Sequence, residues 1–432
     1  MPGAIIESLD HDGRGVCHAE GKVVFIDGGL PGEQVTYEVL RRKPRYETGD
    51  VLQVLRSSAL RVPPRCPHFG HCGGCSMQHL DSAAQPAIKQ RVLEDALRHL
   101  GGVAPGMVLP PIQGPAWHYR HRARLTVRLV PSKGGLLVGF HERRSSHVAD
   151  MQVCHVLPAH VARIVEPLRA LISGLSRPDR IPQVEVAVGD DSTALVLRHL
   201  EPLTSDDLAR VGSFEDRHGI RMWLQPGRPD TARPLRADAE SLLHYGLPEL
   251  GLRLGFRPTD FTQVNPDMNR LLIRRAMQLL DPAPGERIVD LFCGLGNFSL
   301  PMARRSAAVV GVEGSAELVE RARANAQDNG LGAQCAFYEA NLFEATEDSL
   351  DALGPQDKWL IDPPREGAIA VVKALGRVRP GRIVYVSCNP ATLARDAAVL
   401  VHQKGYRLRS AGIANMFPQT SHVESIALFE LA

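Results

Sequence analysis

The sequence has no apolar run long enough to cross a membrane, and aromatic residues make up only 5% of its 432 residues. A membrane-spanning helix needs about 20 consecutive apolar residues. The first eight residues, MPGAIIES, include neither a basic segment nor a long apolar one. We therefore expect no secretory signal and a cytoplasmic protein that has no membrane partner. Internal repeats and low-complexity tracts are missing as well, so we expect folded cores rather than disorder.

A large excess of charge of one sign is also missing. The formal net charge is only +2, so a nucleic-acid site would be a local basic patch rather than a property of the whole chain. The hydrophobic content of 44% is typical of globular proteins, and the length predicts about two or three domains. Eight cysteines in a reducing compartment indicate metal ligands or a catalytic thiol rather than disulfides.

Residues 1–60 are rich in glycine and short apolar segments. Five short strands separated by glycine turns predict a small β-barrel of the OB type. The spacing of DGRGV (12–16) and VVFIDGGLPGE (23–33) resembles that of the TRAM domain found on RNA-modifying enzymes. The basic run at 41–45 falls in the loop between the last two expected strands, where it would suit single-stranded nucleic acid. A solvated loop is the alternative interpretation, so RNA binding by this domain is a hypothesis.

Three cysteines follow a proline-containing linker at the spacing C-x5-C-x2-C: Cys66, Cys72 and Cys75. Glycines between them allow the backbone to fold tightly round a ligand. We expect Cys154 to be the fourth ligand, whereas Cys17, Cys293 and Cys335 lie in strand-like or helix-like settings typical of core residues. Four thiolates suit zinc and a [4Fe-4S] cluster equally, so the spacing predicts a metal site without choosing between them.

Residues 61–260 predict a mixed α/β domain without a catalytic motif. An amphipathic helix is expected at 86–100 and another helix at 159–173. Basic residues alternate along 117–128, which would place arginines on one face of a strand. That face is a candidate track for RNA phosphates, and a solvated sheet face is the alternative.

Residues 261–432 alternate between strand and helix patterns, with helices expected at 267–280 and 315–329. The strand at 287–291 leads into a turn with Gly294 and Gly296, but the third glycine of a dinucleotide fingerprint is absent. Glu313 ends the next strand, where an acidic residue can accept hydrogen bonds from ribose hydroxyls, and Asn341 follows the third. Together these residues resemble the S-adenosylmethionine site of Rossmann-like methyltransferases.

Cys388 stands at the end of the apolar strand 383–387, just before Asn389 and Pro390. Open α/β sheets bind ligands at the carboxyl ends of their strands, so this thiol is a candidate nucleophile. A buried structural cysteine is the commoner alternative. Asp362, at the end of the fourth strand, would face the same crevice, and Glu424 precedes the last strand. The pairing of a thiol with carboxyl groups therefore favours catalysis.

The segments DPPREG (362–367), IVYVSCNPAT (383–392) and HVE (422–424) resemble those of the RNA uracil-5-methyltransferase family. With the barrel and the cysteines, the chain is most similar to the member that acts on 23S ribosomal RNA. The resemblance implies a Rossmann-like α/β methyltransferase domain at 261–432, an OB-fold (TRAM) domain at 1–60, and a central α/β domain at 61–260 that carries a [4Fe-4S] cluster.

The resemblance also implies roles for individual residues. Cys388 would attack uracil as the nucleophile and Glu424 would remove a proton as the base. The cluster ligands would be Cys66, Cys72, Cys75 and Cys154. The residues round S-adenosylmethionine and the target base would be Gln263, Phe292, Asn297, Glu313, Asn341 and Asp362. The expected activity is methylation of carbon 5 of one single-stranded or loop uridine in 23S ribosomal RNA by a monomeric enzyme.

Other functions are weighed against this one. A methyltransferase acting on transfer RNA or on another ribosomal site would use the same chemistry. A radical enzyme would use the cluster on S-adenosylmethionine, but its usual spacing is C-x3-C-x2-C. A non-catalytic RNA-binding protein would leave the pairing of Cys388 with Glu424 unexplained.

Overall fold

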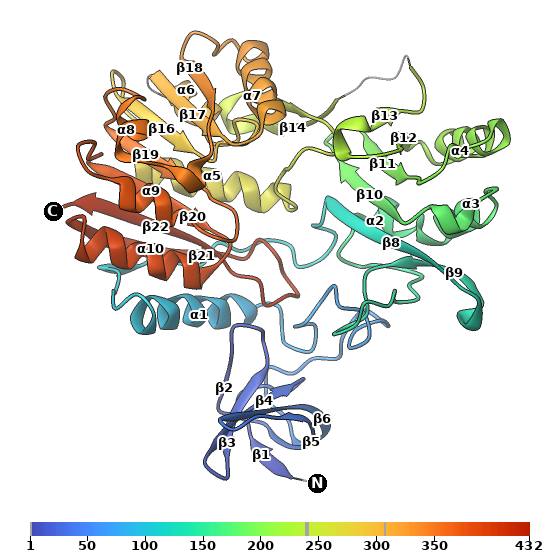
Figure 1. The fold of residues 1–432 in the computed structure, drawn as a ribbon. Helices are drawn as coiled ribbons and strands as arrows, with labels where there is room; N and C mark the ends of the chain where they lie inside the picture. The colour runs from blue at the N-terminus through green and yellow to red at the C-terminus, as the bar shows by residue number, and fades with distance from the viewer. Residues whose placement is uncertain (1, 238–241, 306–307) are drawn as a thin grey trace.

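The computed structural model describes residues 2–237, 242–305 and 308–432. Three sheets and one hairpin follow one another along the chain (Figure 1). Within the described part of the chain, no helix is both long enough and apolar enough to span a membrane.

The N-terminal part is a six-stranded sheet in the order β1-β5-β6-β4-β3-β2. Its strands are β1 (Gly3–Ile5), β2 (Ser8–Leu9), β3 (Gly15–Ala19), β4 (Lys22–Asp27), β5 (Gln34–Arg42) and β6 (Tyr46–Arg56). The sequence predicted five strands, and the difference arises at the start, where β1 adds to the edge of β5. Cys17 belongs to the small apolar core of this sheet, as expected.

The central part is a second six-stranded sheet, in the order β13-β12-β11-β10-β8-β9. Its elements are β8 (Arg122–Val130), β9 (Gly135–Gly139), α2 (Ala159–Ala162), α3 (Val165–Ser173), β10 (Gln183–Val188), β11 (Thr193–Arg198), α4 (Ser205–His218), β12 (Arg221–Gln225) and β13 (Arg233–Pro234). The helix predicted at 159–173 is split into α2 and α3. Pro167 explains the break, because its ring clashes with the carbonyl four residues earlier, at Arg163.

The C-terminal part is an eight-stranded sheet in the order β18-β17-β16-β19-β20-β22-β21-β7. Its elements are α5 (Pro266–Leu280), β16 (Arg287–Leu291), α6 (Ser299–Arg305), β17 (Ala308–Glu313), α7 (Ala316–Asp328), β18 (Cys335–Glu339), α8 (Glu347–Asp351), β19 (Lys358–Ile361), α9 (Ile369–Ala374), β20 (Arg382–Ser387), α10 (Pro390–His402), β21 (Tyr406–Ala414) and β22 (Glu424–Leu431). The strands from β18 to β20 run parallel, and β22 is antiparallel to both of its neighbours. A hairpin of β14 (Leu243–Leu247) and β15 (Leu252–Phe256) packs beside α7.

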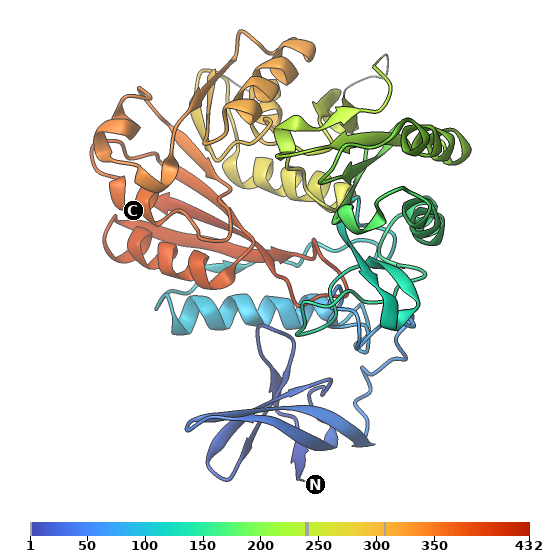
Figure 2. The same ribbon diagram turned by 45° about the vertical axis from the view of Figure 1, so that its right-hand side comes forward.

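Helices cover both faces of this sheet, because alternate strand residues face two separate cores. Leu360 of β19 joins the core under α5, α6 and α7, whereas its neighbours Trp359 and Ile361 join the core under α9 and α10. The second core also receives α1 (Gln85–His99), and β7 (Met107–Val108) pairs with β21. A helix and a strand from the range predicted for the central domain thus complete the C-terminal sheet (Figure 2).

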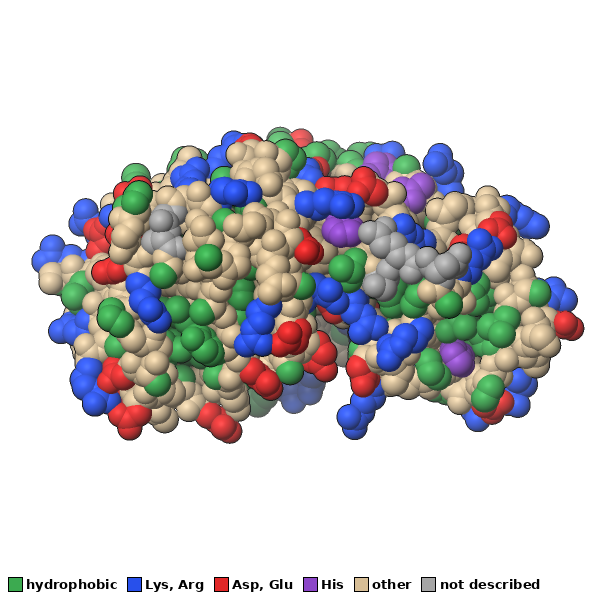
Figure 3. Space-filling model, turned by 90° about the horizontal axis from the view of Figure 1, so that it is seen from above, with side chains coloured by type: hydrophobic (Ala, Val, Ile, Leu, Met, Phe, Trp, Pro, Cys, Tyr) green, Lys and Arg blue, Asp and Glu red, His purple; other side chains and the backbone are tan. Residues whose placement is uncertain are grey.

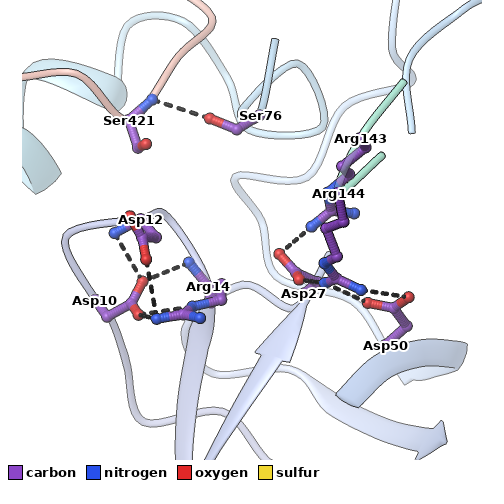
Figure 4. Close-up of polar contacts among 9 residues, drawn as sticks. All are labelled: Asp10, Asp12, Arg14, Asp27, Asp50, Ser76, Arg143, Arg144 and Ser421. Carbon is purple, nitrogen blue, oxygen red and sulfur yellow. Dashed lines mark hydrogen bonds and ion pairs between the residues drawn. The ribbon is translucent and has the colours of Figure 1, made fainter. Parts of the chain in front are cut away.

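The N-terminal sheet lies below α1 (Figure 1), and ion pairs join it to the loop after β9. Arg143 and Arg144 both contact Asp27, and Arg144 also lies 2.9 Å from Asp50 (Figure 4). Seen from above, Lys and Arg side chains are interspersed with Asp and Glu over the face opposite this sheet (Figure 3). That mixture agrees with the small net charge of the chain.

Candidate active site

The parallel strands bring the predicted site residues to one edge of the C-terminal sheet. Phe292, Asp362 and Cys388 each follow directly on the last residue of β16, β19 and β20, and Glu313 is the last residue of β17. Because β22 runs in the opposite direction, its first residue, Glu424, lies at the same edge. This is where doubly wound sheets bind their ligands.

Strand register makes Cys388 and Glu424 neighbours. The last paired residues of β20 and β22 are Ser387 and Ser425, so Cys388 and Glu424 stand one position beyond the same pair. Glu424 is only 3% exposed, whereas the Cys388 side chain is partly exposed to a cavity.

That cavity has a volume of about 480 Å³ and is lined by every residue predicted for catalysis or cofactor binding. They are Gln263, Phe292, Asn297, Glu313, Asn341, Asp362, Cys388 and Glu424. The structure therefore brings together residues that are up to 161 positions apart (263 to 424). Their individual roles stay predictions.

Backbone N–H groups hold the carboxylate of Glu313 in place. One oxygen accepts hydrogen bonds from the amides of Gly314 (2.8 Å) and Ser315 (3.1 Å), and the other accepts one from Gly294 (3.1 Å). Gly294 and Gly296 have φ of +55° and +95°, values that glycine adopts without strain. A carboxylate can accept about four hydrogen bonds, so Glu313 has capacity left for a ligand hydroxyl.

Asn297 is committed to other side chains. Its Oδ1 accepts hydrogen bonds from the hydroxyl of Tyr245 (2.8 Å) and from Nδ2 of Asn269 (2.9 Å), and its own Nδ2 donates to Asn269 (3.0 Å). Tyr245 lies in β14 and lines the cavity, but no motif in the sequence marks it. Asn297 therefore helps to fix the glycine turn, and Tyr245 is a site residue that the sequence reasoning missed.

Aromatic rings form one wall of the cavity. Phe292 has a φ of +66°, a conformation that is uncommon outside glycine, and its ring centroid lies 5.7 Å from that of Phe343. The side chain of Asn341 accepts a hydrogen bond from the amide of Phe343 at 3.1 Å, which holds this ring at the mouth of the cavity. Such a wall can bind a flat, apolar surface such as a purine ring.

Burial favours the protonated forms of the thiol and of the carboxyl groups. It raises the pKa of Cys388 to about 12, with further increases from Glu424 and Asp362 and a smaller opposing effect from Arg365. Burial also raises the pKa of Asp362 to about 7, and it raises the pKa of Glu424 well above the usual value, with Asp362 adding to the increase. A cation bound in the cavity would lower all three pKa values.

A second cavity, of about 440 Å³, also reaches Cys388. Arg365, Cys388 and His422 line both cavities, and the loop after β2 in the N-terminal sheet closes the second one. That loop is fixed by an ion pair between Arg14 and Asp10 (2.6 Å; Figure 4). The Cys388 side chain thus borders two cavities.

The cysteines predicted to bind metal surround a separate small cavity. Cys66, Cys72, Cys75 and Cys154 all line it, and none forms a disulfide. Burial raises the pKa of Cys75 to about 12 and that of Cys154 to about 11, so a bound metal would be needed to keep these thiols ionised.

The chemistry of the donor set fits the kind of group that the sequence predicted. Four thiolates can hold a [4Fe-4S] cluster or a zinc ion.

Comparison with known proteins defines the class. Residues 252–431 match the family model described as tRNA (Uracil-5-)-methyltransferase, and residues 4–52 match the TRAM domain. The crystal structure of Pyrococcus abyssi tRNA (uracil-54, C5)-methyltransferase in complex with S-adenosyl-L-homocysteine superposes with a TM-score of 0.75 at 25% identity, covering 99% of this chain and 100% of that one. The fold is therefore that of a TRAM-containing, S-adenosylmethionine-dependent methyltransferase, as the sequence predicted.

Two relatives define the family more narrowly. The 23S rRNA (uracil(1939)-C(5))-methyltransferase RlmD of Azoarcus sp. (strain BH72) is 67% identical over 431 residues and is covered completely. The RlmD of Nitrosospira multiformis is 59% identical, with 99% of this chain and 98% of the relative covered. The chain belongs to the RlmD family of uracil-5-methyltransferases.

Proposed function

We propose that this chain methylates carbon 5 of a uridine in 23S ribosomal RNA, at the position for which its relatives are named, uracil 1939. S-adenosylmethionine is the methyl donor. One observation carries the proposal: strand register places Cys388 beside Glu424 in a cavity at the ligand-binding edge of a methyltransferase fold.

Cys388 and Glu424 have complementary duties in this reaction. Carbon 5 of uracil is a weak nucleophile until Sγ of Cys388 bonds to carbon 6, which moves an electron pair toward carbon 5. Carbon 5 then takes the methyl group. Glu424 removes the remaining proton from carbon 5, the C5–C6 double bond re-forms, and the C6–S bond breaks to release the thiolate.

We propose that binding of the methyl donor activates the site. S-adenosylmethionine supplies the methyl group and a sulfonium charge. In this cavity a positive charge favours the ionised forms of Cys388, Asp362 and Glu424, whose pKa values are raised by burial. The nucleophile and the base are thus expected to become active only when the methyl donor is in place.

The remaining cavity residues are proposed to bind the donor and the base. Glu313 offers its free acceptor capacity to ribose hydroxyls, while Phe292 and Asn341 face the adenine. Gln263 and Asp362 are proposed to contact the target base and the methionine part of the methyl donor. Asn297 supports the glycine turn from behind.

RNA is proposed to enter through the second cavity, between the N-terminal sheet and α10. Flipping a uridine out of its stack costs a few kcal/mol, and a single-stranded or loop uridine costs least. The sequence placed the basic run at 41–45 in a loop, but the structure extends β5 through Arg42, so the run spans the end of β5 and the turn before β6. This run and the exposed arginines of β8, Arg124 and Arg128, are candidates for phosphate contacts. Arg124 already pairs with Glu185 (3.0 Å), so RNA would have to compete for it.

We also propose that Cys66, Cys72, Cys75 and Cys154 hold a [4Fe-4S] cluster with a structural or RNA-docking role. The functional division is 1–60 for RNA binding, 61–260 for the cluster-containing domain and 261–432 for catalysis, with α1 and β7 packed on the catalytic sheet. We propose that the enzyme acts as a monomer. A ribosomal RNA substrate supports a cytoplasmic location.

Trapping on RNA that contains 5-fluorouridine tests the function. Fluorine at carbon 5 cannot leave as a proton, so the protein is expected to stay bound covalently to a 23S RNA fragment in a denaturing gel. Cys388→Ala should abolish this conjugate, whereas Cys335→Ala, in strand β18 away from the cavity, should not. A conjugate that survives Cys388→Ala, or that forms with transfer RNA in preference to 23S RNA, would contradict the proposal.

A further inference from the structure

The loop between β21 and β22, residues 415–423, connects the methyltransferase cavity to distant parts of the chain. It carries Phe417 and His422, whose rings lie 5.0 Å apart and line the cavity, and it ends on Glu424. The loop has no helix or strand of its own, yet Asn415 and Gln419 are 3% and 2% exposed. Its conformation must therefore be set by groups outside it.

Gln419 is the most constrained residue of this loop. Its φ is +67°, which is uncommon for a residue with a side chain, and such a conformation persists only where the surroundings enforce it. Gln85, which is fully buried in α1, forms a reciprocal pair of hydrogen bonds with Gln419. The backbone N–H of Gln419 donates to Oε1 of Gln85 (2.8 Å), and Nε2 of Gln85 donates to Oε1 of Gln419 (3.1 Å).

Lys89, one turn further along α1, holds the first half of the loop. Its Nζ donates to Oδ1 of Asn415 (2.7 Å) and to the carbonyl of Phe417 (2.9 Å), and the residue is 1% exposed. Both partners are neutral oxygens, so the charge gains little from being buried, and burial lowers the pKa of Lys89 to about 7. Both hydrogen bonds of this buried lysine go to one loop, which indicates that the loop must be held in a fixed position.

The segment 66–77, which carries Cys66, Cys72 and Cys75 and is called the cysteine loop here, contributes the third anchor. Ser76 and Met77 follow directly on Cys75, and their amides both donate to the carbonyl of Gln419 at 3.0 Å. The hydroxyl of Ser76 also accepts a hydrogen bond from the amide of Ser421 at 2.9 Å (Figure 4). The proposed cluster site and the segment leading to Glu424 are thus joined by three hydrogen bonds.

We propose that Gln85, Lys89 and Ser76 are positioning residues that hold the loop 415–423, and thereby Glu424, in place for removal of the carbon-5 proton. The inference rests on the proposed function, since it assigns these residues to the second half of that reaction. The anchors act on Glu424 rather than on Cys388, because Cys388 lies between β20 and α10 and Asn389 caps α10 through its own side chain.

Selective damage to one half of the reaction is the expected consequence. When the anchors are weakened, Cys388 should still attack carbon 6 and the methyl group should still move. Proton removal should slow, because general-base catalysis needs the carboxylate within hydrogen-bond reach of the proton. The covalent RNA–protein adduct should then accumulate on ordinary uridine RNA, which a general loss of structure would not produce.

Rapid-quench kinetics with full-length protein, methyl donor and a carbon-5-tritiated 23S RNA fragment separate the two halves. We expect Gln85→Ala and Lys89→Met to slow tritium release by about 10-fold or more, since displacements of about 1 Å can cost up to about 100-fold. Adduct formation should stay within about 2-fold of wild type. Gln90→Ala is the matched control, because Gln90 lies in the same helix and donates to Glu94 of that helix (3.0 Å).

Ser76→Ala removes a single hydroxyl, so it tests the inference even if Gln85→Ala or Lys89→Met fails to fold. It should give the same pattern with a smaller effect, and Gln85→Ala combined with Gln419→Ala should be less than additive. Release at the wild-type rate, or equal slowing of both halves, would overturn the inference. Failure of wild-type protein to form any adduct would instead overturn the proposed function.

Discussion

Glu424 is the proposed base, so we predict that the fate of the proposed covalent adduct depends on it. Glu424→Gln keeps the shape of the side chain but removes its ability to accept a proton. Methyl transfer should still occur, while product release should fall by about 10²–10⁴-fold, the usual contribution of general acid–base catalysis. A denaturing gel should show the methylated RNA still attached to Cys388. Glu339→Gln, on an exposed position of β18, is the control, and product formation by Glu424→Gln at the wild-type rate would contradict the role.

Asp290 makes a prediction about stability and pH. It is completely buried, Ser299 donates to its Oδ2 at 2.5 Å, and its Oδ1 has no hydrogen-bond partner among the described residues. Burial raises its pKa to about 8, from about 3.9 in an unfolded chain, with smaller increases from Asp362 and Glu313. Because the pKa of Asp290 is raised in the folded state, its contribution to the free energy of unfolding is fully present below about pH 4 and is lost as the pH rises through about 8.

Asp290→Asn should therefore stabilise the protein against urea at pH 9 by a few kcal/mol, since one pKa unit corresponds to about 1.4 kcal/mol. At pH 4 the carboxyl is neutral in the folded state, and the variant and the wild type should differ little. Urea titrations at the two pH values measure this difference. Equal effects at both pH values would show that the change acts through packing rather than through ionisation.

Residues that stand at strand ends could be predicted from the sequence, and residues that act through distant contacts could not. Cys388 and Glu424 are marked by the apolar strands beside them. Tyr245, Gln85 and Lys89 carry no such mark, because the partners through which they act on the site lie from 52 to more than 300 positions away. Only the folded arrangement shows why these polar side chains are buried.

Elements with strong periodicity were predicted almost to the residue. The helices expected at 86–100, 267–280 and 315–329 correspond to α1, α5 and α7, and Pro266 at the start of α5 explains its sharp beginning. Periodicity did not predict which element packs against the apolar face of each helix. The pattern of α1 shows that one face is buried, but not that Leu93 and Leu97 pack into the core of the catalytic sheet.

The cysteine loop makes a prediction at the same scale. Cys72→Ser should remove the iron, of which about four atoms per chain are expected, and should abolish visible absorption of protein purified without oxygen. Thermal unfolding should occur at a lower temperature, because metal binding contributes to folding where buried thiolates need it. Cys335→Ser, outside this loop, should keep the iron. Zinc in place of iron in the wild-type protein would contradict the proposed cluster, whatever the stability of the variant.

At the scale of the whole molecule, the loop after β9 connects two functional sites. Cys72 forms an isolated β-bridge with Glu142, and the next two residues, Arg143 and Arg144, hold the N-terminal sheet. The N-terminal sheet in turn closes the second cavity beside Cys388. The orientation of the TRAM domain relative to Cys388 therefore depends on a short segment next to the proposed cluster. Charge composition alone gave no indication of this, because the chain is nearly neutral.

Replacing Arg143 and Arg144 together by Ala should loosen the N-terminal sheet. Asp27 would lose its ion pairs with both arginines and Asp50 would lose one, while ion pairs that are partly exposed to solvent contribute about 0–1 kcal/mol each. Thermal stability should therefore change little. The radius of gyration from small-angle X-ray scattering without RNA should increase, and KM for the RNA should rise several-fold with kcat nearly unchanged, because only the placement of the RNA-binding domain is affected.

Arg177→Ala is the control, since its partners Asp179 and Glu201 lie in the same central part. A fall in kcat at saturating RNA would contradict this prediction, because it would show that these arginines also affect the catalytic cavity, through the cysteine loop.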